Sequence, residues 1–229
     1  MQVTQYRHEY KFRITYAEYI VLKSRLSAVM RPDAHAGPEG KYFIRSLYFD
    51  DMNDRALREK QDGLSRREKY RIRYYNNDTS FIRLEKKLKA GGLGAKLSAP
   101  LTREETERII AGDIGWMERD ERELLRELYT RMHYGTLRPR TVVDYMREPF
   151  VYGPGNVRVT LDSDIRSGSF STDLFAADLP TVPANAGTII LEVKYDNFLP
   201  DVIRDMVQTE FRQDEAFSKY AACRDCARL

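Results

Sequence analysis

Three segments of the sequence carry a glutamate followed two positions later by a lysine. The pairs are Glu9 and Lys11, Glu85 and Lys87, and Glu192 and Lys194. The apolar and aromatic residues around each pair predict a strand, and residues two apart on a strand point to the same face. Lysine ammonium groups bind phosphate oxygens, and carboxylates can hold a divalent metal that neutralises those oxygens further. The repeated pattern therefore indicates a site for a phosphate-rich anion together with a metal.

Arginines on other strand-like segments fit the same chemistry. The stretch KYRIRYY places Lys69, Arg71 and Arg73 on one face, and YMREPF and NVRVTLDSD contribute Arg147 and Arg158. The last segment carries two more polar residues on the face of its arginine, Thr160 and Asp162. A guanidinium group grips two phosphate oxygens at once and does not lose its charge.

A simpler explanation applies to any one of these strands. An antiparallel sheet with one face in water often carries cross-strand ion pairs on that face. The repetition of mixed charges on several strands favours a second explanation, in which the sheet curls into a barrel whose polar interior holds a charged ligand.

Strands are expected to form the body of the fold. Strand-like runs occupy residues 3–14, 42–50, 66–76, 80–88, 138–148, 156–164 and 187–195. Several follow one another through short turns such as Asn76-Asn77-Asp78, and helices do not alternate with them regularly. This order predicts an α+β fold with an antiparallel sheet.

Helix signals lie between these strands. Thr15 is expected to cap a helix that ends before Pro32, and Thr102 with Glu105 forms a capping box. The remaining signals are Asp50 or Asp51 opening a short helix that Gly63 closes, an amphipathic helix from Glu118 to Met132, and Pro200 in a first helical turn.

Length and composition predict one soluble domain spanning residues 1–229. The chain has 38 basic and 35 acidic residues and a net charge of +3, so the arrangement of the charges matters more than their sum. No apolar stretch is long enough to cross a bilayer, and the first residues, MQVTQYRHEYKF, lack the apolar core of a signal peptide. A cytoplasmic protein without a membrane segment of its own is expected.

Two local motifs are interpreted as structural. Cys223 and Cys226 form a CxxC, but the surrounding sequence shows neither a redox βαβ context nor further zinc ligands at matching spacing, so we expect two small residues on a frayed terminal helix. The loop AGGLGAK fails the phosphate-loop pattern because Ala95 precedes Lys96 and Leu97 follows it. It is expected to be a flexible connection that swings Lys96 toward an anion.

The motifs RHEYKF, RSLYFDD, KYRIRYY, LEKK, KLSAPLT, YMREPF, VRVTLDSD, LEVKY and FSKY, in this order from Arg7 to Tyr220, resemble the VTC domain. This is the polyphosphate polymerase module of the triphosphate tunnel metalloenzyme, or CYTH-like, superfamily. The resemblance implies an eight-stranded antiparallel β-tunnel, a closed barrel with flanking helices, whose basic interior binds triphosphate or polyphosphate.

The resemblance also assigns roles by position. It implies catalytic, phosphate-holding arginines at Arg71, Arg73, Arg147 and Arg158. It implies further phosphate-binding residues at Lys11, Lys87, Lys96, Lys194, Ser218 and Lys219. It places the ligand of Mn²⁺ or Mg²⁺ at Glu192, with Glu9 and Glu85 as further candidates. Lys69 matches no position of the family and is expected at the tunnel mouth.

Two residues depart from the wider pattern. Arg7 replaces the first glutamate of the superfamily's E-x-E-x-K motif, as is usual for the VTC branch, and this lowers the number of acidic metal ligands. Ala216 occupies a position that is basic in the polymerases of the family, which leaves the handling of a terminal phosphate less defined.

The implied reaction is metal-dependent transfer of the γ-phosphate of ATP, or of another triphosphate, to a growing inorganic polyphosphate chain. Two alternatives stay open: hydrolysis of triphosphate or polyphosphate, and a polyphosphate-binding module without turnover. Nucleic acid is not expected as a partner, because the charges alternate in sign along the strands. Coupling to a membrane would need a partner encoded elsewhere.

Overall fold

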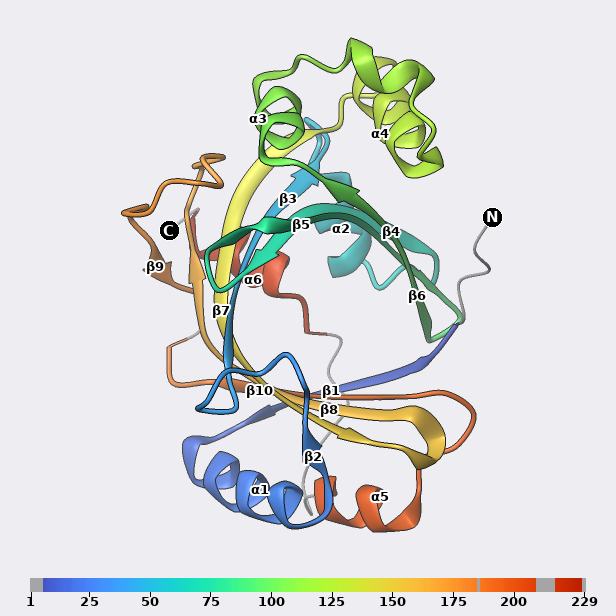
Figure 1. Cartoon of the computed structure of the whole chain (residues 1–229). Coiled ribbons are helices and arrows are strands. Elements are labelled where there is room, and N and C mark those ends of the chain that lie inside the picture. The colour runs from blue at the N-terminus through green and yellow to red at the C-terminus, as the bar shows by residue number, and fades with distance from the viewer. Residues whose placement is uncertain (1–5, 185, 209–216, 228–229) are drawn as a thin grey trace.

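The computed structural model describes residues 6–184, 186–208 and 217–227. Its centre is one antiparallel sheet in the order β1-β10-β8-β7-β3-β4-β5-β6 (Figure 1). The strands are β1 (His8–Ile14), β3 (Tyr42–Asp50), β4 (Arg67–Tyr75), β5 (Asp78–Ala90), β6 (Leu93–Leu101), β7 (Arg138–Tyr152), β8 (Val157–Ser167) and β10 (Ile189–Tyr195). Two short strands, β2 (Arg31–Pro32) and β9 (Val182–Pro183), pair with β7 and β8. The α+β prediction and the antiparallel sheet are therefore confirmed.

The sheet curls without closing fully, so the expected closed barrel is wrong. Its end strands β1 and β6 meet at one isolated bridge, in which Arg7 and Gly94 exchange two backbone hydrogen bonds of 2.9 Å. In the described residues β1 and β6 pair nowhere else, and β1 instead contacts the next strand, β5, through side chains: the Lys87 ammonium group lies 2.7 and 2.8 Å from the two carboxylate oxygens of Glu9.

Helices cover the convex side of the curled sheet at two places (Figure 1). Helices α1 (Tyr16–Val29) and α5 (Asp201–Val207) pack their apolar side chains on β8 and β10. On the other half, α3 (Arg103–Ala111), the 3₁₀ helix η1 (Gly115–Arg119) and α4 (Glu123–His133) pack on β4 and β5. Since side chains alternate along each strand, the apolar outward faces leave the charged faces pointing into the concave side.

Two elements remain near the concave side. Helix α2 (Arg55–Gln61) follows β3, and α6 (Lys219–Cys226) packs with it in a third apolar cluster. A short 3₁₀ helix, η2 (Pro154–Asn156), joins β7 to β8. The polar interior predicted from strand alternation is therefore present, and α6 brings the C-terminal part of the chain to it.

The structure confirms the predicted helix caps and the turn after β4, but not the predicted start of the first strand. The predicted capping box of Thr102 with Glu105 is present, and the expected cap Thr15 also forms a capping box, with Glu18. The turn after β4 is formed by two asparagines in the left-handed region, Asn76 and Asn77. The expected strand over residues 3–14 begins at His8, and residues 3–5 lie outside the described part of the chain.

Three element boundaries differ from the prediction. Neither Asp50 nor Asp51 begins α2, whose first residue is Arg55; the Asp50 carboxylate accepts hydrogen bonds from the backbone of Ala56 and Leu57 and so holds the start of the helix. The helix expected from Glu118 is divided, because the backbone is extended at Asp120. The segment AGGLGAK is a tight β-hairpin, and Lys96 lies on the following strand β6, so the expected flexible connection is wrong.

The two cysteines lie on the C-terminal helix, as expected. Cys223 and Cys226 are free thiols on α6, and burial raises the pKa of Cys223 to about 12. The expected fraying is wrong for this helix, because the Ser167 hydroxyl of β8 donates a 3.0 Å hydrogen bond to the Cys223 carbonyl and holds α6 on the sheet.

Candidate functional site

The concave side of the sheet encloses a cavity of about 1070 Å³. Nearly all of the site residues expected from the sequence line it, namely Glu9, Lys11, Arg71, Arg73, Lys87, Lys96, Arg147, Arg158, Glu192, Lys194, Ser218 and Lys219. The cavity continues past the edge of β6 to α4, where Arg122 and Glu127 line it. Glu85 lies beneath the lining and is 1% exposed.

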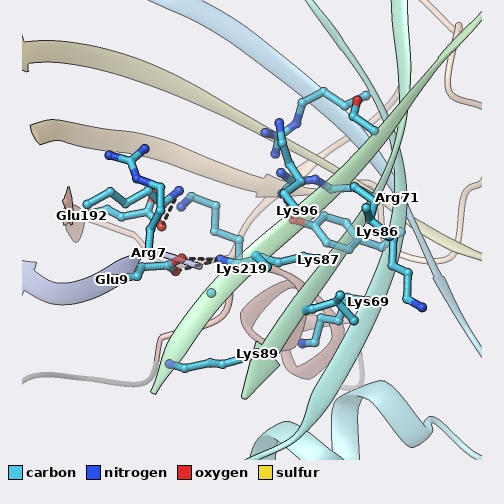
Figure 2. A pocket seen from close by; sticks show the side chains of 18 of the residues that line it. Arg7, Glu9, Lys69, Arg71, Lys86, Lys87, Lys89, Lys96, Glu192 and Lys219 are labelled. Carbon is cyan, nitrogen blue, oxygen red and sulfur yellow. Dashed lines mark hydrogen bonds and ion pairs between the residues drawn. The ribbon is translucent and has the colours of Figure 1, made fainter. Parts of the chain in front are cut away.

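One half of the cavity, formed by β1, β10, β8 and β7, is called here the compensated wall. Neighbouring strands place opposite charges side by side: Glu9 is opposite Lys194, and Lys11 is opposite Glu192. The Lys11 ammonium group lies 2.8 Å from Glu9 and 3.7 Å from Glu192, so these two carboxylates flank the same lysine. Figure 2 shows Glu9 and Glu192 on the same side of the cavity.

The carboxylates of this wall are held in the ionised form. Burial alone would raise the pKa of Glu192, but Lys194, Lys11 and Arg147 outweigh it and hold that pKa well below its usual value. The pKa of Glu9 is lowered in the same way, since Lys11 and Lys87 overcome its burial. Ionised oxygens that face the cavity are the donors that Mg²⁺ and Mn²⁺ prefer.

Asp162 is a residue of this wall that the sequence analysis did not assign to the site. It lies fully buried on β8, and the Arg147 guanidinium forms a bidentate pair with it at 2.6 and 2.7 Å. Lys219 of α6 also reaches it, at 2.6 Å. The signal was its position on the same strand face as Arg158 and Thr160, which the alternation already showed.

The other half, formed by β4, β5 and β6, is called here the cationic wall. Lys69 is opposite Lys87, and Lys87 is opposite Lys96, so three lysines form a row across three strands. Like charges directly opposite each other destabilise a sheet unless an anion lies between them. Figure 2 shows these lysines around the cavity, across from Glu192.

Glu85 supplies the carboxylate beneath this wall. Its oxygens accept hydrogen bonds from Arg71 at 2.7 Å and from Lys96 at 2.6 Å. Burial would raise the pKa of Glu85, but Arg71, Arg73 and Lys96 hold it well below its usual value. The buried carboxylate therefore orients the two cations that stand between it and the cavity.

Arg73 is placed mainly by hydroxyl groups. Its guanidinium donates to the Ser46 hydroxyl and to the Tyr145 hydroxyl, both at 2.8 Å, and the side chain is almost fully buried. The nearest Glu85 oxygen is 3.9 Å away. Its positive charge is thus only partly compensated inside the protein.

The start of α6 adds Ser218 and Lys219 to the cavity. Ser218 caps the helix, and Lys69 donates a 3.1 Å hydrogen bond to its hydroxyl. The helix is anchored by the Tyr220 hydroxyl, which donates to Asp50 at 2.7 Å, and by Arg224 at 3.0 Å from Asp54. These contacts hold residues distant in the sequence beside β4 and β8.

Arg158 lies apart from the arginines around Arg71. It contacts Asp33 at 2.8 Å and the Tyr42 hydroxyl at 2.8 Å, and in the register it is opposite Lys194. The Nε atom of Arg158 and the Thr160 hydroxyl are buried without a hydrogen-bond partner. Unsatisfied polar atoms beside a cavity are expected where a ligand completes the contacts.

The residues fit a divalent metal that arrives with a phosphate ligand. Among the residues that the structure describes, no group of three or more acidic, histidine or cysteine side chains could hold a metal alone. Glu192 and Glu9 flank one lysine on neighbouring strands, so they offer one or two carboxylates. Mg²⁺ is often bound by one or two carboxylates together with substrate phosphates.

The fold and the charged cavity define a class of protein: a curled antiparallel sheet whose concave face gathers lysines, arginines and ionised carboxylates. The VTC domain model matches residues 6–228, which is nearly the whole chain. The protein belongs to the VTC domain family.

Solved structures support the fold. A proposed adenylyl cyclase from Hippeastrum, described as having a dominant triphosphatase activity, is 13% identical, with 96% of each chain covered and a TM-score of 0.57. A proposed adenylate cyclase from Bacillus halodurans is also 13% identical, with a TM-score of 0.50 over 83% of this chain and 81% of its own. No curated protein matches the chain. Within the described residues, no helix has the length and apolar character needed to span a bilayer.

Proposed function

We propose that the protein is a polyphosphate polymerase-like phosphotransferase that moves the γ-phosphate of ATP onto inorganic polyphosphate. The observation that carries this proposal is the division of one cavity into a wall with a row of three mutually opposed lysines and a wall with two ionised carboxylates. The first suits a chain of phosphates, and the second suits the metal that accompanies a triphosphate.

The proposed step needs no nucleophile from the protein. A terminal phosphate oxygen of the acceptor attacks the γ-phosphorus, the bond from that phosphorus to the bridging oxygen breaks, and ADP leaves with the electron pair. Two of the three histidines stack on tyrosines, His8 on Tyr195 and His133 on Tyr129. The side chains would align the acceptor with the γ-phosphate and neutralise the charge of the phosphates.

Each group of residues has a distinct role in this proposal. Arg71, Arg73 and Arg147 hold the transferred and leaving phosphates, and Arg158 holds a phosphate at the Thr160 side. The lysines and the start of α6 contact the remaining phosphates, namely Lys11, Lys87, Lys96, Lys194, Ser218 and Lys219.

Acidic residues divide into metal-binding and positioning residues. Glu192, with Glu9 beside it, would hold Mn²⁺ or Mg²⁺, which when bound neutralises charge on the phosphoryl group. Glu85 and Asp162 lie beneath arginines and orient them, so we assign Glu85 to positioning rather than to the metal.

Hydrolysis of triphosphate is the second candidate. The similarity to the Hippeastrum protein, described by its dominant triphosphatase activity, favours it. Water would then take the place of the acceptor phosphate, and the same side chains would hold the substrate. A third candidate, binding of polyphosphate without turnover, keeps the basic lining and needs no carboxylate for a metal.

The proposal places the reaction in the cytoplasm, where ATP is available, and in a single domain spanning residues 1–229. Any delivery of the polymer across a membrane is assigned to a partner encoded elsewhere.

One assay separates the three candidates. Purified protein is incubated with ATP, Mn²⁺ and a short polyphosphate primer, and products are resolved on a gel and assayed for orthophosphate. Lengthened polyphosphate with an equal amount of ADP is expected. Release of orthophosphate alone would overturn the polymerase in favour of hydrolysis, and no product despite bound polyphosphate would leave a binding module.

Variants connect the activity to the cavity. Arg71→Ala and Arg158→Ala are expected to abolish turnover while the circular dichroism spectrum stays native. Arg119→Ala, at an exposed position outside the cavity, is the matched control. Normal rates in both cavity variants would remove the assignment of the site.

A further inference from the structure

The cationic wall extends beyond the residues considered so far. Two residues before Lys69 on β4 stands Arg67, and it is opposite Lys89 on β5. Both side chains line the cavity, as does Lys69. Because alternate residues share a strand face, Arg67, Lys69 and Arg71 form one line along β4.

This extension has no carboxylate to balance it. Across the described residues, no acidic side chain lies within ion-pair distance of Arg67, Lys69 or Lys89. The contacts of Lys69 are the Ser218 hydroxyl at 3.1 Å and the face of the Tyr220 ring, whose centroid is 5.1 Å away. A row of two opposed cations next to a row of three lysines costs free energy in the empty protein.

The charge state of Lys69 agrees with this cost. Burial lowers its pKa to about 7, and Lys11, Arg67 and Lys60 add to the effect against the attraction of Asp50. A bound polyanion would favour the charged form of the lysine again.

The length of the line distinguishes two kinds of ligand. From Arg71 to Arg67 the strand advances by roughly 14 Å, because each residue of an antiparallel strand adds about 3.4 Å. Arg71 lies at the centre of the site, beside Glu85 and Lys96. The line of cations is therefore longer than three linked phosphates, and Figure 2 shows Lys89 farther from Arg71 than Lys87 is.

We propose that Arg67, Lys69 and Lys89 form an outer subsite for the continuing phosphates of a linear inorganic polyphosphate, beyond the triphosphate-binding centre at Arg71 and Arg73. The inference rests on the proposed phosphate chemistry of the cavity and adds the direction in which the chain extends, along β4 and β5 toward their Arg67 and Lys89 ends.

The test compares two probes, inorganic triphosphate and a size-fractionated polyphosphate several times longer, by isothermal titration calorimetry. The Arg67→Ser, Lys89→Ser double variant is expected to bind the long chain about tenfold more weakly, because charge-assisted contacts are lost. Its affinity for triphosphate is expected to stay within about twofold of wild type, because Arg71 and Arg73 are unchanged.

A matched control removes the same charge elsewhere. The Arg25→Ser, Arg119→Ser double variant changes two exposed residues outside the cavity, and both affinities are expected to stay at wild-type values. Lys69→Met is a second test within the subsite and is expected to show the same selective loss for the long chain. Thermal melting confirms that each variant is folded.

Equal weakening of both probes, or no weakening of either, would overturn the outer subsite. So would an equal loss in the control variant, because the effect would then come from net charge. The measurement is of binding alone. A selective loss together with an absence of polymer synthesis would therefore keep the subsite while the polymerase proposal failed.

Discussion

The two walls of the cavity arrange their charges by opposite rules. On the compensated wall, Glu9 is opposite Lys194 and Lys11 is opposite Glu192, so each cation has a carboxylate neighbour. On the cationic wall, lysine is opposite lysine, and the carboxylates that contact this row lie outside it: Glu85 is buried beneath and contacts Lys96, and Glu9 of β1 contacts Lys87. Opposed residues therefore attract each other on the first wall and repel each other along the lysine row of the second.

This difference suits the two walls to different ligands, a metal on the first and an anion on the second. The alternating charges of the first wall keep its carboxylates ionised and in place, which a metal requires before it binds. The opposed lysines of the second wall repel each other, and a bound anion would relieve that repulsion, so part of the binding free energy would come from the empty state. Variants of the two walls should therefore fail in different ways.

The largest effect is expected on the compensated wall. Glu192→Gln should lower kcat by roughly a hundredfold to a thousandfold, because the proposed ligand of the metal is lost. Binding of metal-free triphosphate should be retained or strengthened, since a negative charge leaves the cavity. Steady-state kinetics and calorimetry measure the two quantities.

Glu107→Gln, an exposed change of the same kind on α3, is the control and should behave as wild type. Equal loss of triphosphate binding and turnover in Glu192→Gln would contradict the division between the walls.

The next effect concerns stability on the same wall. Arg147→Met should lower the free energy of unfolding by about 3 kcal/mol, because the fully buried Asp162 loses its bidentate partner. Urea denaturation in a buffer without phosphate measures this change. A loss below about 0.5 kcal/mol would show that Lys219 alone satisfies Asp162.

A smaller effect should appear in the pH dependence of binding to the cationic wall. Burial lowers the pKa of Lys87 to about 7, despite the attraction of Glu9. Phosphate binding raises this pKa, so a proton is taken up and affinity falls as the pH rises through the free-state pKa. The affinity for inorganic triphosphate should fall by roughly tenfold between about pH 7 and about pH 9.

Calorimetry in two buffers of different ionisation enthalpy measures the proton uptake directly. Lys87→Arg supplies the control, because arginine stays charged throughout this range. If the variant and the wild type lose affinity equally as the pH rises, Lys87 does not cause the fall.

The smallest effect has the opposite sign from that of Arg147. Lys69→Met should raise the free energy of unfolding by roughly 0.5 to 1 kcal/mol, because it removes a cation opposed to Lys87. The gain should be largest at and below about pH 7, since the pKa of Lys69 is about 7 in the folded protein against a usual value of 10.5.

This gain in the free energy of unfolding should shrink as the pH rises toward 10.5, where Lys69 of the unfolded chain also loses its proton. Arg25→Met, at an exposed position, should change stability by less than about 0.5 kcal/mol. A Lys69→Met protein that is less stable than wild type would contradict the claim that opposed lysines destabilise the cationic wall.

Strand alternation predicted most of the site. It placed the glutamates, lysines and arginines of six segments on common faces, and the structure brings those faces together around one cavity. It did not predict strand β6, because glycine, alanine, serine and proline are frequent in that segment and have low strand propensity. Lys96 was expected at the cavity, but its position on a paired strand could not be read from such a composition.

Other features depend on distant parts of the chain. The failure of β1 and β6 to pair along their length follows from how far the whole sheet curls, which no local segment records. Ser218 and Lys219 reach the cavity because Tyr220 and Arg224 anchor α6 to residues after β3. From the sequence, only the family resemblance pointed to them.

Only the bridge between Arg7 and Gly94 joins the two ends of the described sheet, so the sheet is not a fully paired barrel. A fully paired barrel would admit a long chain only end first, whereas a sheet joined by one bridge would also release a chain sideways when that bridge opens. Opening one bridge costs far less than separating the long ladder between β7 and β8. Hydrogen exchange at the Arg7 and Gly94 amides should accordingly proceed by local opening while the rest of the sheet stays protected.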